Sequence, residues 1–296
     1  MRETPRREDR ERDRVLARAK RYPYAAPETS YAITTAGRYE LVGLGPDRPG
    51  TGLASGVRAR HAESGEELPF AAIPADDLDS DSLDARLPAL AYGANRTAEA
   101  LERKRALPGF PAEESILVLR ARLYDLDVVY SAHVSPYGSV GATLQRSPGT
   151  AVEVCVTLLT AAQLEALGET ERSYTLEELR DLDLELEGGA RLDRAHAYVS
   201  RHAALVLDGA EVALAAIPAT GRRFEARTEP QTLAAVARRL GHRGDLDDFI
   251  LAAVDDPELA AARTRELRRD ARPLDWPGGA PAADRPRGNP LEESGR

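Results

Sequence analysis

Cysteine is almost absent from this chain of 296 residues, since Cys155 is the only one. A single thiol excludes an intramolecular disulfide and any zinc cluster that is held by cysteines. Cys155 stands in the apolar run VEVCVTL with no histidine close in sequence, so we expect a buried, inert thiol within a strand.

Long apolar runs are absent as well. Nowhere do 18 apolar residues follow one another, and the N-terminal stretch MRETPRREDRERDR has no apolar core of signal-peptide length. We therefore expect no membrane association and a cytoplasmic location. With 42% apolar residues the chain can still bury a sizeable core, as one large domain or two modest ones.

Lysine and histidine are sparse. Lys20 and Lys104 are the only lysines among 40 basic residues, and we interpret the excess of arginine as a compositional bias. Because the arginines form no single stripe and the formal net charge is -9, nucleic acid is not an expected partner. The five histidines show no zinc-ligand spacing, so we expect no metal ion and no other cofactor. The groups left to carry a function are carboxylate side chains and backbone N–H donors.

Composition divides the chain into four segments. Residues 1–22 mix arginine with acidic residues and are expected to be a disordered arm or a frayed helix. Residues 23–85 form a β-rich extension, with strands predicted in YAITTAG, RYELVGLG, GVRARHA and LPFAAIP. Residues 86–257 carry the motifs described below, and residues 258–296 are expected to be a helix and a disordered tail.

Two stretches of the extension invite a ligand-binding interpretation. The glycine-rich GLGPDRPGTG, residues 43–52, lacks the Gly-Lys-Ser/Thr ending of a phosphate loop and is predicted to be a turn. The acidic DDLDSDSLD, residues 76–84, lacks the glycine and the closing glutamate of a calcium loop and is predicted to be a solvated linker.

Local signals place several elements after the extension. Residues 115–132 are predicted to form one long strand or two shorter ones. Thr160 with Gln163 forms a capping box at a helix start, and Thr228 before Glu229-Pro230 marks a second helix start. A hairpin is expected to turn at Asp208-Gly209.

Four segments of the chain resemble, in order, the γ-glutamylcyclotransferase-like superfamily. They are LAYGAN at 90–95, GATLQRSPGTAVEV at 141–154, LTAAQLEALGETERSY at 159–174 and the helical TEPQTLAAVARRLGHRGDLDDFI at 228–250. Members of the family carry Y-G-S-N after the first strand, an A-T-x-x-x-S-P-G hairpin and a Leu-Asp-x-x-Glu turn that ends in the catalytic glutamate. The resemblance covers about residues 86–257.

The resemblance implies an intramolecular aminolysis. A γ-glutamyl compound folds back, its own α-amine attacks the γ-carbonyl, an amine or amino acid leaves and 5-oxoproline closes. The reaction needs a carboxylate that carries protons, and burial of such a carboxyl in a cavity brings its pKa toward neutrality. In LGETE the resemblance assigns this role to Glu171, with Glu169 as the competitor if the alignment slips by two residues.

The same resemblance makes Tyr92, Gly93, Ala94 and Asn95 the substrate-binding turn. A strand-to-helix turn exposes backbone N–H groups that suit a carboxylate. Asn95 donates to the ligand or, in the simpler alternative, only caps the next helix. Ala94 replaces the usual serine. Tyr174 is expected in the pocket wall, and it supplies a hydroxyl there.

We therefore expect an α+β protein. Its centre would be a mixed, partly closed β-barrel of the γ-glutamylcyclotransferase-like type with surrounding helices, and the β-rich extension would pack on the barrel or cover its mouth. The expected partner is a small γ-glutamyl or amino-acid-like ligand. Whether the protein is an enzyme stays open, because a non-catalytic ligand-binding or scaffold protein on the same barrel fits the sequence too. Neither the leaving group nor the oligomeric state follows from the sequence.

Overall fold

The computed structural model describes residues 7–44 and 57–277. Most of the predicted glycine-rich turn at 43–52 and most of the predicted tail lie outside these residues. In the described part of the chain, no helix has both the length and the apolar character needed to cross a bilayer.

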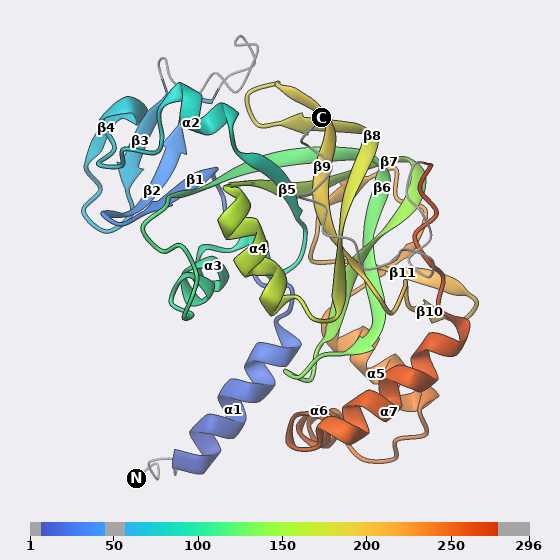
Figure 1. Ribbon diagram of the computed structural model, residues 1–296. Coiled ribbons are helices and arrows are strands. Elements are labelled where there is room, and N and C mark those ends of the chain that lie inside the picture. Colours follow the sequence, from blue (N-terminus) through green and yellow to red (C-terminus); the bar gives the residue numbers. More distant parts are fainter. Residues whose placement is uncertain (1–6, 45–56, 278–296) are drawn as a thin grey trace.

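Five strands close a mixed barrel, which confirms the expected fold class (Figure 1). They are β5 (Leu87–Ala91), β6 (Ile116–Val134), β7 (Val140–Leu159), β8 (Tyr174–Leu186) and β9 (Arg191–Ser200). The ring runs β5–β7–β6–β8–β9 with antiparallel pairs, and it closes through a parallel pair between β9 and β5. Each strand contributes to one apolar core, through side chains that include Leu90, Leu117, Val156, Leu184 and Ala197. Burial of these apolar side chains is the main force that holds the ring closed.

The β-rich extension continues the barrel sheet. Its strands are β1 (Tyr31–Thr34), β2 (Gly37–Val42), β3 (Arg58–His61) and β4 (Glu67–Pro69), and they form an antiparallel meander. Strand β1 pairs with β6 in the register Tyr31 to Val118, so the meander extends the sheet at that edge. The extension is thus joined to the barrel by backbone hydrogen bonds, whereas the division of the chain into domains stays a prediction.

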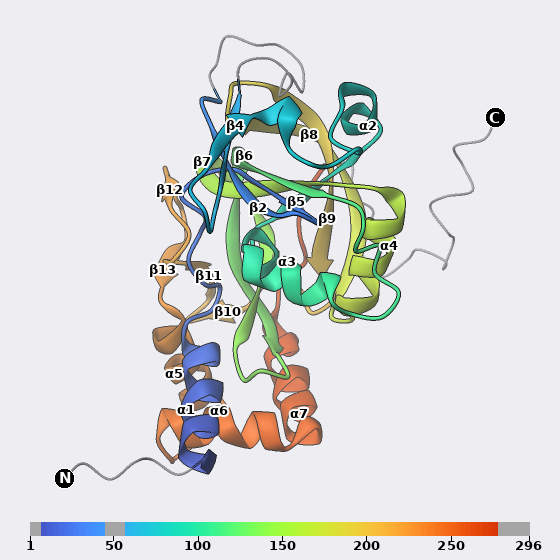
Figure 2. The same cartoon turned by 90° about the vertical axis from the view of Figure 1, so that its left-hand side faces the viewer.

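The charged N-terminal arm contains a helix, α1 (Arg7–Lys20), where the sequence favoured a solvated arm. Leu16 and Ala19 are buried on one face of α1, and the helix contacts two C-terminal helices, α5 (Glu229–Arg239) and α6 (Leu246–Asp255) (Figure 2). Lys20 also forms an ion pair with Asp247 of α6. An apolar stripe of two residues is hard to recognise in a sequence dominated by charged residues. For this reason the sequence favoured a solvated arm over a packed helix.

The other helices surround the barrel. They are α2 (Ser80–Asp84), α3 (Ala98–Arg105), α4 (Ala161–Thr170) and α7 (Pro257–Leu267), with short 3-10 turns η1 (Phe70–Ala72), η2 (Ala94–Arg96) and η3 (Arg268–Asp270). Four more short strands lie in the described residues: β10 (Val206–Leu207), β11 (Ala210–Leu214), β12 (Ala219–Thr220) and β13 (Glu225–Arg227).

The local signals predicted these elements well. Thr160 caps α4 and Thr228 caps α5, each in a complete capping box. The hairpin between β10 and β11 turns at Asp208 and Gly209, which both have positive φ, as the Asp-Gly pair predicts. The long apolar stretch forms the single strand β6, which bulges at Asp125.

Candidate functional site

A cavity of about 450 Å³ lies beside the ends of β5 and α4. All six residues that the sequence singled out line it: Tyr92, Gly93, Ala94, Asn95, Glu171 and Tyr174. Residues 92–95 follow β5 directly, and Glu171 is the C-cap of α4. Segments that lie about 75 residues apart are therefore brought to one space by the barrel.

Asn95 does not cap the helix that follows the turn, because it lies inside the 3-10 turn η2. Thr97 is the N-cap of α3, since its side chain accepts a hydrogen bond from the Ala100 N–H. The alternative that Asn95 only caps a helix is therefore wrong. Within the described residues, the backbone N–H groups of Gly93, Ala94 and Asn95 donate no hydrogen bond to another protein group, and all three residues line the cavity.

Glu171 belongs to a closed triangle of polar contacts. Its Oε1 accepts hydrogen bonds from Asn95 Nδ2 at 2.9 Å and from Lys104 Nζ at 2.5 Å, and Lys104 Nζ also donates to Asn95 Oδ1 at 2.7 Å. The Glu171 side chain is 15% exposed. Glu169, the competitor, is exposed on α4 and does not line the cavity. Of the two carboxylates, Glu171 alone is placed to act on a ligand there.

Tyrosines dominate the cavity wall. Six of the ten tyrosines of the chain line it: Tyr22, Tyr24, Tyr92, Tyr137, Tyr174 and Tyr198. Burial raises the pKa of the Tyr22, Tyr92 and Tyr174 hydroxyls well above the ordinary value. These hydroxyls therefore stay protonated at neutral pH, and they serve as hydrogen-bonding groups and not as bases.

Tyr22, which the sequence did not indicate, comes from the segment after α1. Its hydroxyl accepts a hydrogen bond from the Ala142 N–H at 3.0 Å. A Cβ at position 93 would lie 2.8 Å from the same hydroxyl, so Gly93 is needed for Tyr22 to approach the turn. The N-terminal segment is thus part of the cavity wall.

His133 is a second residue that the sequence did not indicate. Its Nδ1 lies 2.8 Å from Ser131 Oγ, and its ring stacks on His202 at 5.0 Å between centroids. Burial, together with His202, lowers the pKa of His133 to about 3, so the ring is neutral at physiological pH. A Cβ at position 141 would collide with this ring and would lie 2.7 Å from the Tyr174 hydroxyl, which explains the glycine there.

The charge of the lining differs from that of the whole protein. Among the described lining residues, Glu171 is the one carboxylate. Four cationic side chains line the same cavity, namely Arg18, Arg103, Lys104 and Arg172. The chain as a whole has a net charge of -9. A positive cavity in an acidic protein favours an anionic ligand.

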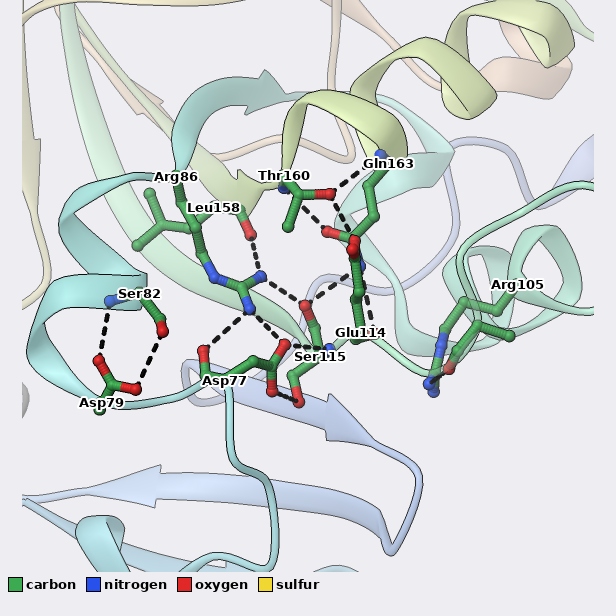
Figure 3. A network of polar contacts seen from close by, with 11 residues as sticks. Asp77, Asp79, Ser82, Arg86, Arg105, Glu114, Ser115, Leu158, Thr160 and Gln163 are labelled. Carbon is green, nitrogen blue, oxygen red and sulfur yellow. Dashed lines mark hydrogen bonds and ion pairs between the residues drawn. The ribbon is translucent and has the colours of Figure 1, made fainter.

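A buried network joins the starts of β5 and α4 (Figure 3). Arg86, just before β5, donates to the carbonyl oxygens of Ser115 and Leu158 and pairs with Asp77 at 2.6 Å. Gln163 in the first turn of α4 donates to the same Ser115 carbonyl. The opposite end of β5 leads into the turn at 92–95, and the opposite end of α4 carries Glu171. The network therefore fixes the position of the turn relative to Glu171.

The acidic run is therefore structural and not a solvated linker. Asp77 accepts three hydrogen bonds from Ser115 and Arg86, and Asp79 caps α2 by accepting from the Ser82 N–H. No group of three or more His, Cys, Asp or Glu side chains among the described residues is arranged to hold a metal ion.

No protein-family model matches the chain, and no curated protein matches it significantly. Among solved structures it is similar to a gamma-glutamyl cyclotransferase, with 17% identity, a TM-score of 0.32 and coverage of 65% of this chain and 92% of the other. It is also similar to an uncharacterized protein from Homo sapiens, with 16% identity, a TM-score of 0.33 and coverage of 66% and 93%. Values this low say nothing about the activity of the present chain.

Proposed function

We propose that this protein catalyses the intramolecular aminolysis of a γ-glutamyl amine or γ-glutamyl amino acid, with 5-oxoproline as a product. The observation that carries the proposal is the position of Glu171, which lines the same cavity as Gly93, Ala94 and Asn95, whose N–H groups donate no hydrogen bond to any described residue. A proton carrier and a carboxylate-binding turn are the two parts that this reaction requires.

The chemistry follows from these parts. The turn binds the α-carboxylate of the folded substrate and holds its α-amine against its γ-carbonyl carbon, which replaces a loose encounter by a fixed geometry. Glu171 takes a proton from the attacking α-ammonium, and the amine nitrogen forms a bond to the carbonyl carbon. Glu171 then gives this proton to the leaving nitrogen as the old C–N bond breaks. The ring nitrogen loses its second surplus proton to Glu171, which passes it to the released amine, so the amine leaves as an ammonium ion and Glu171 ends as a carboxylate.

The test is to incubate the purified protein with a panel of γ-glutamyl amines and amino acids and to measure 5-oxoproline. We expect at least one substrate to react and Glu171→Gln to lower the rate by about 100-fold or more. Glu169→Gln is the matched control, because it makes the same change two residues away on the exposed side of α4, and it should keep the wild-type rate. Product formation that is unaffected by Glu171→Gln would refute the role of Glu171, and no turnover of any member of the panel would refute the activity.

The second candidate is a non-catalytic binding protein on the same barrel. The observation that favours it is the ion pair between Glu171 and Lys104, which occupies the carboxylate that would have to carry the proton. Ala94 stands where the family pattern Y-G-S-N has a serine, so the turn lacks one hydroxyl donor. Calorimetric binding of a panel member without any release of 5-oxoproline would favour this candidate over the enzyme.

A further inference from the structure

Lys104 lines the cavity and contacts Glu171 directly, yet the proposed reaction gives it no role. It stands in the last turn of α3, its side chain is 18% exposed, and its Nζ contacts Glu171 Oε1 and Asn95 Oδ1. An ammonium group has three N–H donors. Two of them are used by Glu171 and Asn95, and the third donates to no other group in the described part of the chain.

The reaction brings a second ammonium group to the same carboxylate. The α-ammonium of the substrate has to reach Glu171 in order to give up its proton, and there it would meet Lys104 Nζ, which lies 2.5 Å from Glu171 Oε1. Two positive charges on one partly buried carboxylate repel each other strongly. Lys104 therefore needs another anionic partner when the substrate is bound.

The substrate itself carries that partner. Its α-carboxylate is attached to the same carbon as its α-ammonium, so both charges enter the cavity together. Because Lys104 contacts Asn95, its ammonium lies next to the turn that is proposed to bind the carboxylate. An exchange of partners, in which the substrate ammonium pairs with Glu171 and Lys104 pairs with the substrate carboxylate, leaves every charge compensated.

We propose that Lys104 binds the α-carboxylate of the substrate, and that it leaves Glu171 for this carboxylate when the substrate ammonium takes its place. The proposal rests on the proposed function, and it makes Lys104 a determinant of substrate specificity. The use of lysine supports it, because only two of the 40 basic residues are lysines. A compact ammonium on a flexible stem changes partners within a small space more easily than a planar guanidinium.

The experiment compares a γ-glutamyl amide with the 4-aminobutanoyl amide of the same amine, which lacks the α-carboxylate and would cyclise to 2-pyrrolidinone. The ratio of kcat/KM for the two compounds is measured for the wild type, for Lys104→Met and for Lys20→Met. Lys20 is the matched control, because it is the only other lysine and it pairs with Asp247 outside the cavity lining. Circular dichroism verifies that each variant is folded, and Lys104→Gln replaces Lys104→Met if the latter is not.

We expect Lys104→Met to raise KM for the γ-glutamyl compound by about 10- to 100-fold, the range for loss of a charge-assisted hydrogen bond, and to change kcat less. The 4-aminobutanoyl compound should be affected little, so the wild-type preference for the carboxylate is lost, whereas Lys20→Met should retain it. An equal loss for both compounds would overturn the proposal, because Lys104 would then only position Glu171.

A binding measurement separates this proposal from the proposed function. Calorimetry compares 5-oxoproline with 2-pyrrolidinone, which differ by the carboxylate alone, and it needs no turnover. We expect the wild type to prefer 5-oxoproline and Lys104→Met to lose that preference. If no substrate turns over but the wild type prefers 5-oxoproline and Lys104→Met does not, the reaction is refuted and Lys104 is still the carboxylate-binding residue. If Lys104→Met keeps the preference for 5-oxoproline, the role of Lys104 is refuted.

Discussion

Removal of the Asp77 carboxylate tests whether the network in Figure 3 holds the fold together. Asp77 accepts hydrogen bonds from Ser115 N at 2.7 Å, Ser115 Oγ at 2.7 Å and Arg86 Nη2 at 2.6 Å. The Arg86 side chain is 2% exposed, so Asp77→Ala would leave its guanidinium buried without a counter-ion. Such a buried charge is costly even though the carbonyl oxygens around Arg86 remain as acceptors.

The expected magnitude follows from the exposure of the pair. Breaking a fully buried ion pair costs about 3–5 kcal/mol. Asp77 is 31% exposed, so water can partly replace its carboxylate, and we expect Asp77→Ala to lower the free energy of unfolding by about 2–3 kcal/mol. Burial tends to raise the pKa of Asp77, but the hydrogen bonds from Ser115 and the Arg86 charge lower it overall. The stabilisation is therefore present at neutral pH, and it is lost as the pH falls through that lowered pKa.

Urea unfolding at neutral pH, followed by circular dichroism, measures this loss. Asp76→Ala is the matched control, because it removes the same charge from the neighbouring exposed position, and it should change the free energy of unfolding by less than about 0.5 kcal/mol. If the two variants unfolded at the same urea concentration, the network would not carry the stability assigned to it.

Two further predictions concern the cavity wall. Gly93→Ala places a Cβ 2.8 Å from the Tyr22 hydroxyl and should cost about 1–2 kcal/mol of unfolding free energy, and Tyr22→Phe should remove most of that cost, because the nearest ring carbon would be 3.9 Å away. A double-mutant cycle in urea measures the coupling, and purely additive losses would contradict the contact. His133 has a pKa of about 3 in the folded protein against an ordinary value of 6.5, so between these pH values only the unfolded chain binds the proton and stability falls as the pH falls. We expect this residue to contribute up to about 1.4 kcal/mol per pH unit to the loss, and His133→Gln should flatten the dependence of unfolding free energy on pH, whereas an unchanged slope would show that His133 titrates normally.

The parts of the fold that could be predicted from the sequence are those fixed by neighbouring residues. The capping boxes at Thr160 and Thr228 and the Asp208-Gly209 turn depend on residues within three positions of one another, so a single sequence reveals them. The pairing of β1 with β6 could not be predicted, because strand partners about 90 residues apart leave no mark in the local pattern.

The candidate site shows the same limit. The turn at 92–95 and Glu171 were indicated by the order of motifs along the chain, which a sequence displays directly. Lys104 stands in the charged run ERKR of α3, where nothing in the helical pattern distinguishes it from its arginine neighbours. The one signal in the sequence is the rarity of lysine, which a compositional bias explains equally well.

The N-terminal segment shows why a division of the chain by composition misses part of the site. Composition sets residues 1–22 apart as an arm and predicts that 23–85 pack on the barrel or cover its mouth. In the structure Arg18, Tyr22 and Tyr24 line the same cavity as Glu171. The Tyr22 hydroxyl also satisfies the N–H of Ala142 in β7. Because an unpaired N–H in this wall would carry a desolvation cost, the barrel depends on the N-terminal segment at that point. The segment therefore belongs to the structure of the site, and the substrate has to fit a cavity that the barrel strands alone do not define.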